Sequence, residues 1–530
     1  MNLVPGALSI LVLKYLKMET NPPFYYWRPV TLLIIAKFGF HLAFLSRYGF
    51  QRDELLYQAL GDHPAFGYWS NPPLIGWISW LTQHTLGDAL WATRIPALLA
   101  GCGVLAVAVL IAREFGGGKY AQILTGFGVL VSPAYLRSSH LFQPVVFDIL
   151  LWSLMSLFFV RYLRRGERRD ILWFGLTFGL GFLNKYSVGF LLIALVPVLL
   201  FSSRRRVLWS KAAGEAALIA LILILPNLIW QYSHDFPVWT HMQELAAYQL
   251  GNVTLTGFVL DQLLMNFPGL ILWLGGLGWL LFNERAALFR PAAGLFISVI
   301  LIFILFSGKS YYTLGIYPML LAAGGVAWAS WIKILAGRIF LPLAMLLLLL
   351  PILPLGVPVL KMDRLTSYCR YLIDIGLDAP MRWENGRVYP LPQDYADMLG
   401  WTEIARLAAE AEDLTAAGEA VVIYGDNYGQ AAAVDHYGSQ WDLPRAISFA
   451  DTYRLWLPEK LNAQTLIYIN DELGPDLVEL FEDIRLVGQV ENPLARERGT
   501  GVYLCRNPRR DLQVFWDERV AMVPGARSSP

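Results

Sequence analysis

The segment Arg168–Arg206 reads RRDILWFGLTFGLGFLNKYSVGFLLIALVPVLLFSSRRR and decides how the chain is threaded. Both of its flanks are basic, and the positive-inside rule places such flanks on the cytoplasmic side of a membrane. The apolar run Ile171–Phe201 must therefore cross an even number of times, and its length suits two short crossings of roughly 15 residues. We expect the two helices to meet in an outer turn at Asn184–Ser187, because Lys185 inside one long helix would be costly.

The composition of the whole chain is typical of a membrane protein. Hydrophobic residues make up 56% of the chain and charged residues 16%, whereas ordinary soluble domains carry about 25% charged residues. The net charge of +1 points to no nucleic-acid or acidic partner. Near the amino end the lysines follow a short apolar stretch, and no small-residue cleavage site comes after it. We therefore expect no removable secretory leader, and Met18 is an alternative start.

The same rule, applied to the other basic loops, predicts a polytopic α-helical membrane protein with about eleven transmembrane helices. Its amino end is expected inside and its carboxyl end outside. The predicted parts are a cytoplasmic N-terminal segment (residues 1–24), a transmembrane domain (25–360) with a first outer loop over about 48–90, and an extracytoplasmic domain (361–530). The other expected spans lie near Thr31–Tyr48, Trp91–Ile111, Tyr120–Leu136, Gln143–Val160, Ala212–Trp230, Phe258–Leu281, Pro291–Ser307, Leu314–Trp331 and Ile339–Leu360.

Beyond residue 360 charged residues become frequent and the apolar runs shorten. Strand-like and helix-like patterns alternate there, which predicts a small α/β domain. The expected strands are Ala420–Tyr424, Thr465–Asn470, Arg485–Val490 and Gly501–Cys505, and the expected helices are Thr402–Ala417 and Pro475–Phe481. No GxGxxG motif is present, so a dinucleotide site is not expected.

The three cysteines form no metal-binding pattern. Cys102 lies in an apolar span and is expected to fill the membrane core. A disulfide between Cys369 and Cys505 is an alternative to two free thiols if the tail lies outside the cytoplasm.

The threading gathers ionisable side chains at the outer boundary of the membrane. Asp148 lies about one turn inside a span, where an unpaired carboxylate is costly, so a buried structural pair is the alternative to a functional role. For Lys185 and Lys309 the alternative is snorkelling of the lysine along apolar surface. Cations at this depth suit a phosphate, and a carboxylate suits proton abstraction from an attacking hydroxyl or amine. The phosphate of a lipid lies at this depth, which predicts transfer of a sugar from a lipid phosphate.

Seven stretches, in this order along the chain, resemble the membrane type C (GT-C) glycosyltransferases. The similarity is to the branch of protein O-mannosyltransferases, the lipid A aminoarabinose transferase and the galacturonosyltransferases of lipopolysaccharide core, and it covers about Tyr25–Cys505. The stretches are DELLYQAL…GYWSNPPLIGW (53–77), TRIPALLAG (93–101), FGLTFGLGFLNKYSVGFLL (174–192), PNLIWQYSHDFPVW (226–239), SGKSYYTLGIYP (307–318), LPQDYADMLGWTEIA (391–405) and DNYGQAAAVDHYG (426–438).

The resemblance implies a polyprenyl-phosphate sugar donor, inversion at the sugar carbon, and a set of site residues. This chain has Asn71 and Leu56 where some relatives have basic residues, so the phosphate-binding set is widened with two arginines. Some relatives bind a divalent ion; no metal site is assigned here, and a divalent cation is left open. The implied catalytic residues are Asp53, Glu54 and Asp148, the donor-phosphate residues are Lys185, Lys309, Tyr312, Arg52 and Arg137, and the substrate-pocket residues are Tyr57, His63, Tyr68, Asn71 and His234.

The predicted function is that of a glycosyltransferase in the plasma (inner) membrane. It would move one sugar to a glycolipid, polysaccharide or protein of the cell envelope on the extracytoplasmic side. One alternative is a polysaccharide ligase or polymerase with a diphosphate-linked donor. A second is a transporter or flippase, which would need polar residues on a path to both faces. A third is a structural or sensor role for the outer domain.

Overall fold

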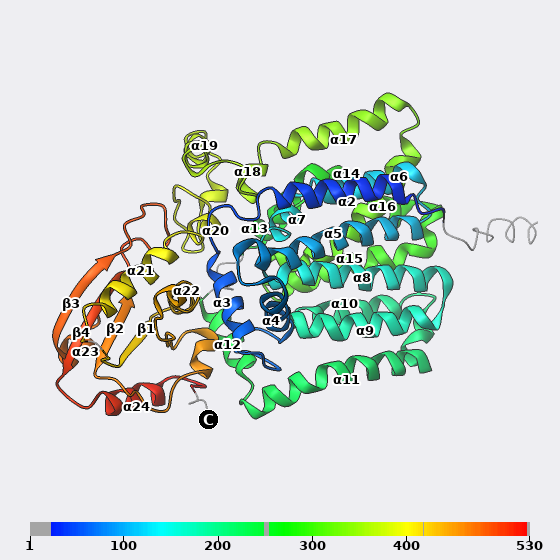
Figure 1. The fold of residues 1–530 in the computed structure, drawn as a ribbon. Coiled ribbons are helices and arrows are strands. Elements are labelled where there is room, and N and C mark those ends of the chain that lie inside the picture. Colours follow the sequence, from blue (N-terminus) through cyan, green and yellow to red (C-terminus); the bar gives the residue numbers. More distant parts are fainter. Residues whose placement is uncertain (1–22, 249–253, 417, 527–530) are drawn as a thin grey trace, which may run out of the picture.

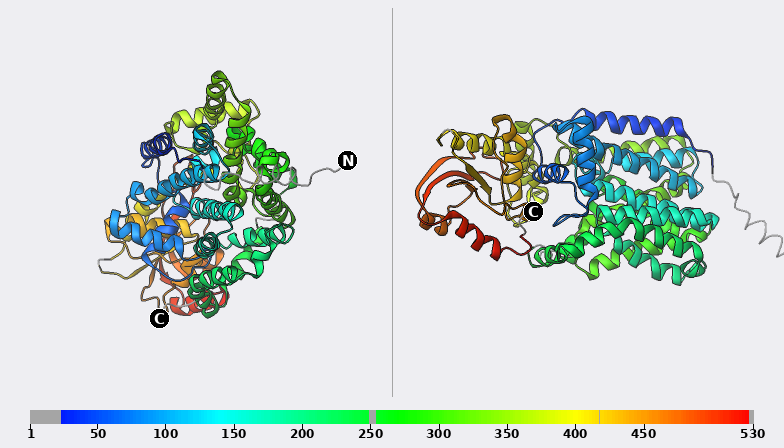
Figure 2. Two further views of the ribbon diagram at one scale, coloured as in Figure 1. Left: turned by 90° about the vertical axis from the view of Figure 1, so that its right-hand side faces the viewer. Right: turned by 60° about the horizontal axis from the view of Figure 1, so that its bottom comes forward.

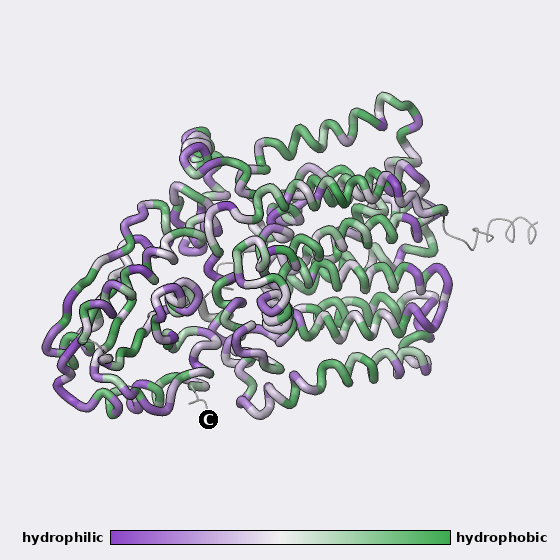
Figure 3. The backbone as a smooth tube through the Cα atoms, viewed as in Figure 1, coloured by the Kyte–Doolittle hydropathy of each residue, from purple (hydrophilic) through white to green (hydrophobic). Residues whose placement is uncertain are grey.

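The computed structural model describes residues 23–248, 254–416 and 418–526. It consists of a helical bundle with a small α/β domain at one end (Figures 1 and 2). The bundle helices are largely hydrophobic, and hydrophilic residues concentrate at the two ends of the bundle and in the α/β domain (Figure 3). The predictions made for residues 1–22 lie outside the described residues.

Helices occupy each of the predicted spans. Among the described residues, five helices are long and apolar enough to cross a membrane alone, and a bent pair makes a sixth. The remaining ones are shorter, so the count of eleven crossings stays a prediction. The bundle helices are α2 (Trp27–Leu42), α5 (Leu90–Glu114), α6 (Lys119–Leu130), α8 (Pro144–Arg165), α9 (Arg168–Asn184), α10 (Val188–Leu200), α11 (Lys211–Ser233), α14 (Leu270–Phe282), α15 (Arg290–Leu305), α16 (Tyr317–Trp331) and α17 (Leu335–Leu349).

The predicted hairpin at Lys185 is confirmed. Helix α9 ends at Asn184 and α10 begins at Val188, and Lys185 between them has an extended backbone with φ −158° and ψ 128°. The Asn184 side chain donates a hydrogen bond of 3.0 Å to the carbonyl of Pro144, the first residue of α8. This bond fixes the turn beside the start of α8.

Three predicted spans are broken rather than continuous. The eleventh divides into α17 and the short helix α18 (Leu353–Gly356). The third stops at Leu130, and α7 (Pro133–Ser138) follows as a separate short helix. The eighth divides into α13 (Leu255–Leu264) and α14, which are bent by 73° about η3 (Phe267–Gly269). A proline starts α7 and another lies in η3, and proline cannot donate the backbone hydrogen bond that continues a helix. The breaks beside α7 and η3 lie next to each other, because the Ser132 hydroxyl donates a hydrogen bond of 2.7 Å to Asn266 Oδ1.

The predicted first outer loop folds into α3 (Arg52–Asp62) and α4 (Leu74–Leu86). A reciprocal cap starts α3: the Gln51 side chain accepts from the backbone N–H of Asp53 at 2.8 Å, and Glu54 accepts from the N–H of Gln51 at 2.9 Å. Helix α12 (Pro237–Tyr248) lies at the same end of the bundle, close to the α/β domain (Figure 1).

The α/β domain contains a four-stranded sheet in the order β1-β2-β4-β3. The first two strands pair in parallel, and the other two pairs are antiparallel. The four strands lie at the predicted segments, although β3 begins earlier than expected, and α19, α20, α22 and α24 were not predicted. The strands are β1 (Val421–Gly425), β2 (Thr465–Asn470), β3 (Phe481–Gln489) and β4 (Gly501–Pro508), and the helices are α18 (Leu353–Gly356), α19 (Met362–Asp374), α20 (Gln393–Ala396), α21 (Trp401–Glu412), α22 (Tyr428–Tyr437), α23 (Pro475–Leu480) and α24 (Leu512–Met522).

The two faces of this sheet pack in different ways. On one face Ile423, Ile467 and Leu504 pack against α21 and α22 in a core that also contains residues of α3. On the other face, the core with α23 and α24 is made only of residues from the α/β domain. The near face is therefore continuous with the first outer loop, because one apolar core joins the two.

The disulfide alternative is wrong for Cys369 and Cys505. Both thiols are free and buried. Cys369 packs in the core beneath α19, whereas Cys505 on β4 packs with α23 and α24. The two residues therefore lie in separate apolar cores.

Candidate active site

Asp53 lies in the first turn of α3, where the helix dipole favours a negative charge. Its Oδ1 accepts a hydrogen bond of 2.8 Å from the phenol of Tyr428. Its Oδ2 accepts a longer bond of 3.4 Å from Gln143 Nε2. The Arg52 Nε lies 3.8 Å from Oδ1, and the Asp53 side chain remains 29% exposed. Oδ2 is thus the less firmly bonded oxygen of a carboxylate that solvent can reach.

Tyr428 comes from the α/β domain and is placed by its own helix cap. It is the first residue of α22, and the Asn427 side chain accepts from the backbone N–H of Gly429 at 2.9 Å. Gly429 allows α22 to approach α3, because a Cβ atom there would lie 2.6 Å from Arg52 Cγ. Burial, and next the charge of Asp53, raise the pKa of Tyr428. The phenol therefore keeps its proton and donates a hydrogen bond to the Asp53 carboxylate.

Glu54, the neighbouring acid, is fully buried in a structural network. Arg94 donates to both of its oxygens, at 2.9 Å from Nε and 2.8 Å from Nη2. The backbone N–H groups of Phe142 and Gln51 complete the shell at 2.8 and 2.9 Å. With every acceptor position occupied, this carboxylate does not fit the direct catalytic role that the sequence suggested. It ties α3 to α5 instead.

A second group of site residues surrounds Lys185 at the α9–α10 turn. The ammonium lies 4.1 Å from the ring centroid of Tyr312 and 4.9 Å from that of Tyr311. Both tyrosines belong to η5 (Ser310–Ile316), which precedes α16. Lys185 is also the charged group that acts on the buried Asp148 of α8. Asp148 Oδ1 has no hydrogen-bond partner among the residues the structure describes.

Tyr311 connects this group with Asp53. It is close enough to interact electrostatically with both Tyr57 and Asp53. Arg137 of α7 interacts with Tyr311 and Asp53 as well, and it forms an ion pair with Asp394 of the α/β domain. Predicted residues from five segments therefore lie together at the end of the bundle that faces the α/β domain. They are Arg52, Asp53, Tyr57, Arg137, Asp148, Lys185 and Tyr312.

Lys309 lies at the rim of this group. Its ammonium is 3.9 Å from a carboxylate oxygen of Glu384 in the α/β domain, and 21% of its side chain is exposed. It precedes η5, so the same turn carries Lys309 and the two tyrosines that face Lys185.

Four predicted pocket residues make their hydrogen bonds and ring contacts with residues other than Asp53. His63 is at the opposite end of α3 and stacks on Trp456 with 4.2 Å between the ring centroids. Tyr68 is buried and donates to the carbonyl of Leu60 at 3.0 Å. The other two make local contacts: Asn71 donates to Ser70 at 2.7 Å, and His234 stacks on Trp230 at 4.1 Å.

The described ranges contain no group of three or more His, Cys, Asp or Glu side chains placed to hold a metal ion. The residues that the sequence reasoning missed are Tyr428, Gln143, Tyr311 and Arg94. Three of the four lie in stretches quoted above, but no local pattern shows that Tyr428 meets a residue 375 positions away.

Part of the chain is similar in sequence to known proteins. A family model described as dolichyl-phosphate-mannose-protein mannosyltransferase matches residues 70–230. The chain is 28% identical over 200 residues to the lipid A galacturonosyltransferase RgtD of Rhizobium johnstonii, covering 37% of this chain and 41% of that relative. It is 29% identical over 222 residues to the undecaprenyl phosphate-alpha-4-amino-4-deoxy-L-arabinose arabinosyl transferase of Pseudomonas paraeruginosa, covering 38% and 39%. The matches span about two fifths of the length of these relatives.

A likeness in structure extends over much more of the chain. The crystal structure of ArnT from Cupriavidus metallidurans bound to undecaprenyl phosphate superimposes with a TM-score of 0.57 at 14% identity, covering 90% of this chain and 97% of that one. The apo state of the same protein gives a TM-score of 0.54. The fold is therefore shared with ArnT, and parts of the chain are similar in sequence to the mannosyltransferase family model and to the two glycosyltransferases named above.

Proposed function

We propose that the chain is an inverting glycosyltransferase that uses a sugar linked to a polyprenyl phosphate. The acceptor is a glycolipid of the lipid A or lipopolysaccharide class. The observation that carries the proposal is that Asp53, Arg137 and Lys185 all interact with Tyr311 at one end of the bundle. The relatives named above, with lipid A and undecaprenyl phosphate in their names, support the choice of donor and acceptor.

The proposed reaction uses Asp53 as general base. An acceptor hydroxyl placed at Oδ2 gives its proton to the carboxylate, and its oxygen forms a bond to the anomeric carbon of the sugar. The bond from that carbon to the phosphate oxygen breaks on the opposite side, and its electron pair leaves with the polyprenyl phosphate. Lys185 and Arg137 stabilise the charge that gathers on the departing phosphate, at the rim of the hydrocarbon where their effect is least screened.

The proposal includes an orientation in the inner membrane. The end of the bundle that carries the arginine-rich loops faces the cytoplasm, in accordance with the positive-inside rule. The α/β domain and the site then face the extracytoplasmic side, where the headgroup of the donor lies. A transporter would need a polar path between these ends, whereas the helices that join them are mostly hydrophobic (Figure 3).

The test is Asp53→Asn, measured with a polyprenyl-phosphate sugar and a lipid A acceptor in detergent. We expect transfer to fall below one per cent of wild type, because base catalysis contributes about 10²–10⁴-fold, while donor binding is retained. The matched control is Asp62→Asn, which makes the same change at the exposed far end of α3, where Asp62 pairs with Arg445 at 3.5 Å. Wild-type turnover by Asp53→Asn would refute the assignment, and turnover of diphosphate-linked donors alone would favour the ligase alternative.

A further inference from the structure

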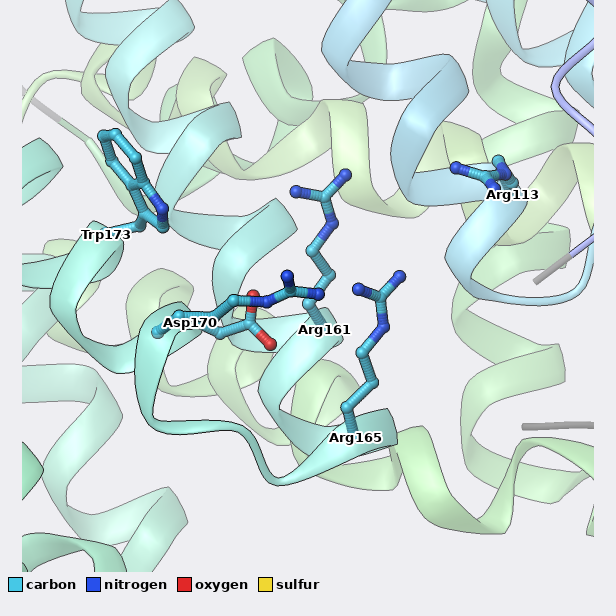
Figure 4. A pocket seen from close by; sticks show the side chains of 6 residues that line it. Arg113, Arg161, Arg165, Asp170 and Trp173 are labelled. Carbon is cyan, nitrogen blue, oxygen red and sulfur yellow. The ribbon is translucent and has the colours of Figure 1, made fainter. Parts of the chain in front are cut away.

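A second charged hollow lies at the opposite end of the bundle from Asp53. It has a volume of about 390 Å³ and is formed by the ends of α5, α8 and α9 (Figure 4). Its walls are made of Arg113, Arg161, Arg165, Arg169, Asp170 and Trp173. Arg113 approaches from α5, and Arg161 and Arg165 approach from α8 (Figure 4). None of these residues takes part in the proposed transfer reaction.

The arginines are held in place by a buried acid behind the hollow. Glu114 accepts from Arg161 Nε at 3.1 Å and from Arg165 Nη2 at 2.8 Å, and its side chain is fully buried. Arg113 Nε donates to the carbonyl of Pro23 at 2.8 Å. These bonds fix one edge of each guanidinium group. Since guanidinium carries five N–H donors, the other edge remains to bind an anion.

Positive charge exceeds negative charge in the walls. Four arginines line the hollow and only one carboxylate, that of Asp170, lies among them. Arg169 is paired with Glu167 outside the lining, and Glu114 is already shared among Arg161, Arg164 and Arg165. The site therefore suits a ligand with a net negative charge, and arginine is the residue that best matches the oxygens of a phosphate.

Asp170 places a second requirement on the ligand, which is a hydrogen-bond donor. It is only 2% exposed, and its Oδ2 is buried without a hydrogen-bond partner in the described part of the chain. A buried acceptor without a donor costs about 1–3 kcal/mol, and more when the group is charged. A ligand that carries a hydroxyl group beside its phosphate would supply the missing donor.

The position of the hollow suits a lipid. Trp173 at its edge is 51% exposed and stacks on Phe158 with 6.1 Å between the ring centroids. Tryptophan is enriched at the boundary between hydrocarbon and headgroups. Basic pockets between helices at the cytoplasmic boundary are suited to anionic headgroups.

We infer that this hollow binds an anionic glycerophospholipid whose phosphodiester headgroup carries hydroxyl groups, as in phosphatidylglycerol. The phosphate contacts the free edges of Arg113, Arg161 and Arg165, the charge of Arg169 in the wall adds to the attraction, and a headgroup hydroxyl donates to Asp170 Oδ2. The assignment to the cytoplasmic leaflet rests on the membrane orientation of the proposed function, whereas the binding itself does not.

The test measures lipid binding by the full-length protein in detergent, by native mass spectrometry and thermal shift. The probes are phosphatidylglycerol, phosphatidic acid, phosphatidylethanolamine, phosphatidylcholine and inorganic phosphate. We expect phosphatidylglycerol to bind best, and the double variant Arg113→Gln/Arg169→Gln to bind it about 25-fold more weakly, at roughly fivefold for each arginine. These two arginines are chosen because Arg161 and Arg165 also hold the buried Glu114.

Two further variants keep the test specific. Arg168→Gln removes the same charge from a neighbouring residue that pairs with Glu215 at 2.7 Å outside the hollow, and it should leave binding unchanged. Asp170→Ala should remove the preference for phosphatidylglycerol over phosphatidic acid. Sugar transfer in detergent should persist in all variants, so a failure here is distinct from a failure of the proposed function.

Three results would overturn the inference. The first is equal lipid binding by the double variant and by Arg168→Gln. The second is binding of inorganic phosphate as tight as that of the lipid, which would make the site one for a free anion. The third is no preference for phosphatidylglycerol over phosphatidylethanolamine, which would refute the argument from net charge.

Discussion

Tyr428→Phe tests whether the α/β domain takes part in the chemistry. The change removes one oxygen and with it the 2.8 Å hydrogen bond to Asp53 Oδ1, while the ring that packs under Arg52 remains. A hydrogen bond to a charged group contributes about 1.5–3 kcal/mol. Because the Asp53 side chain is 29% exposed and water can replace part of the bond, we expect the loss of this hydrogen bond to cost about 1–2 kcal/mol. This corresponds to a roughly 5- to 30-fold fall in kcat.

The assay follows sugar transfer over a range of donor concentrations, so that kcat and KM are obtained separately. The donor KM should change little, because the lost hydroxyl group bonds only to the base and the ring that packs against Arg52 is kept. Tyr453→Phe is the matched control, since Tyr453 donates an equally long bond of 2.8 Å to Asp435 in the same domain, away from Asp53. Unchanged kcat in Tyr428→Phe, or an equal fall in Tyr453→Phe, would refute the reasoning.

Three further predictions follow from the packing around the site. Glu54→Gln should lower the free energy of unfolding by about 3–5 kcal/mol, because it leaves the fully buried Arg94 without its charge partner; a thermal midpoint equal to wild type would contradict this. Gly429→Ala should lower both sugar transfer and the free energy of unfolding, the latter by about 1–3 kcal/mol. The reason is that the new methyl group meets Arg52 where α3 and α22 are in contact. Wild-type values in the transfer and melting assays would argue against this close contact. Burial raises the pKa of Asp397 to about 6, whereas it is about 3.9 in the unfolded chain. Between these two pH values the folded protein therefore binds one proton more than the unfolded chain. The free energy of unfolding should fall by about 2–3 kcal/mol as the pH rises from 4 to 6. Unfolding curves over that range should show the slope, and Asp397→Asn should reduce it.

Sequence patterns predicted the elements whose signal is local. The α9–α10 hairpin was predicted at Lys185 because basic flanks on both sides demand an even number of crossings. Four strands of the α/β domain were found from short apolar alternations. The break between α13 and α14 was missed, although Pro268 marks it, because hydropathy alone cannot separate one straight span from two bent halves.

The candidate site was predicted only in part, for a physical reason. Depth in the membrane is set by hydropathy and loop charge, so Asp53, Asp148 and Lys185 could be assigned to one level of the bundle. The direction in which each side chain points within that level depends on how the helices pack, and no local sequence pattern reveals this packing. Glu54 and Asp53 are neighbours in sequence, yet one is enclosed by Arg94 and the other meets Tyr428.

The unequal faces of the sheet have an evolutionary consequence. Substitutions on the near face, where Ile423 and Leu504 share a core with α3, disturb the alignment of the catalytic helix as well as the domain itself. Substitutions on the far face, beneath α23 and α24, are felt only within the domain. Sequence change on the far side of this domain should therefore carry little risk to the reaction proposed at the near side.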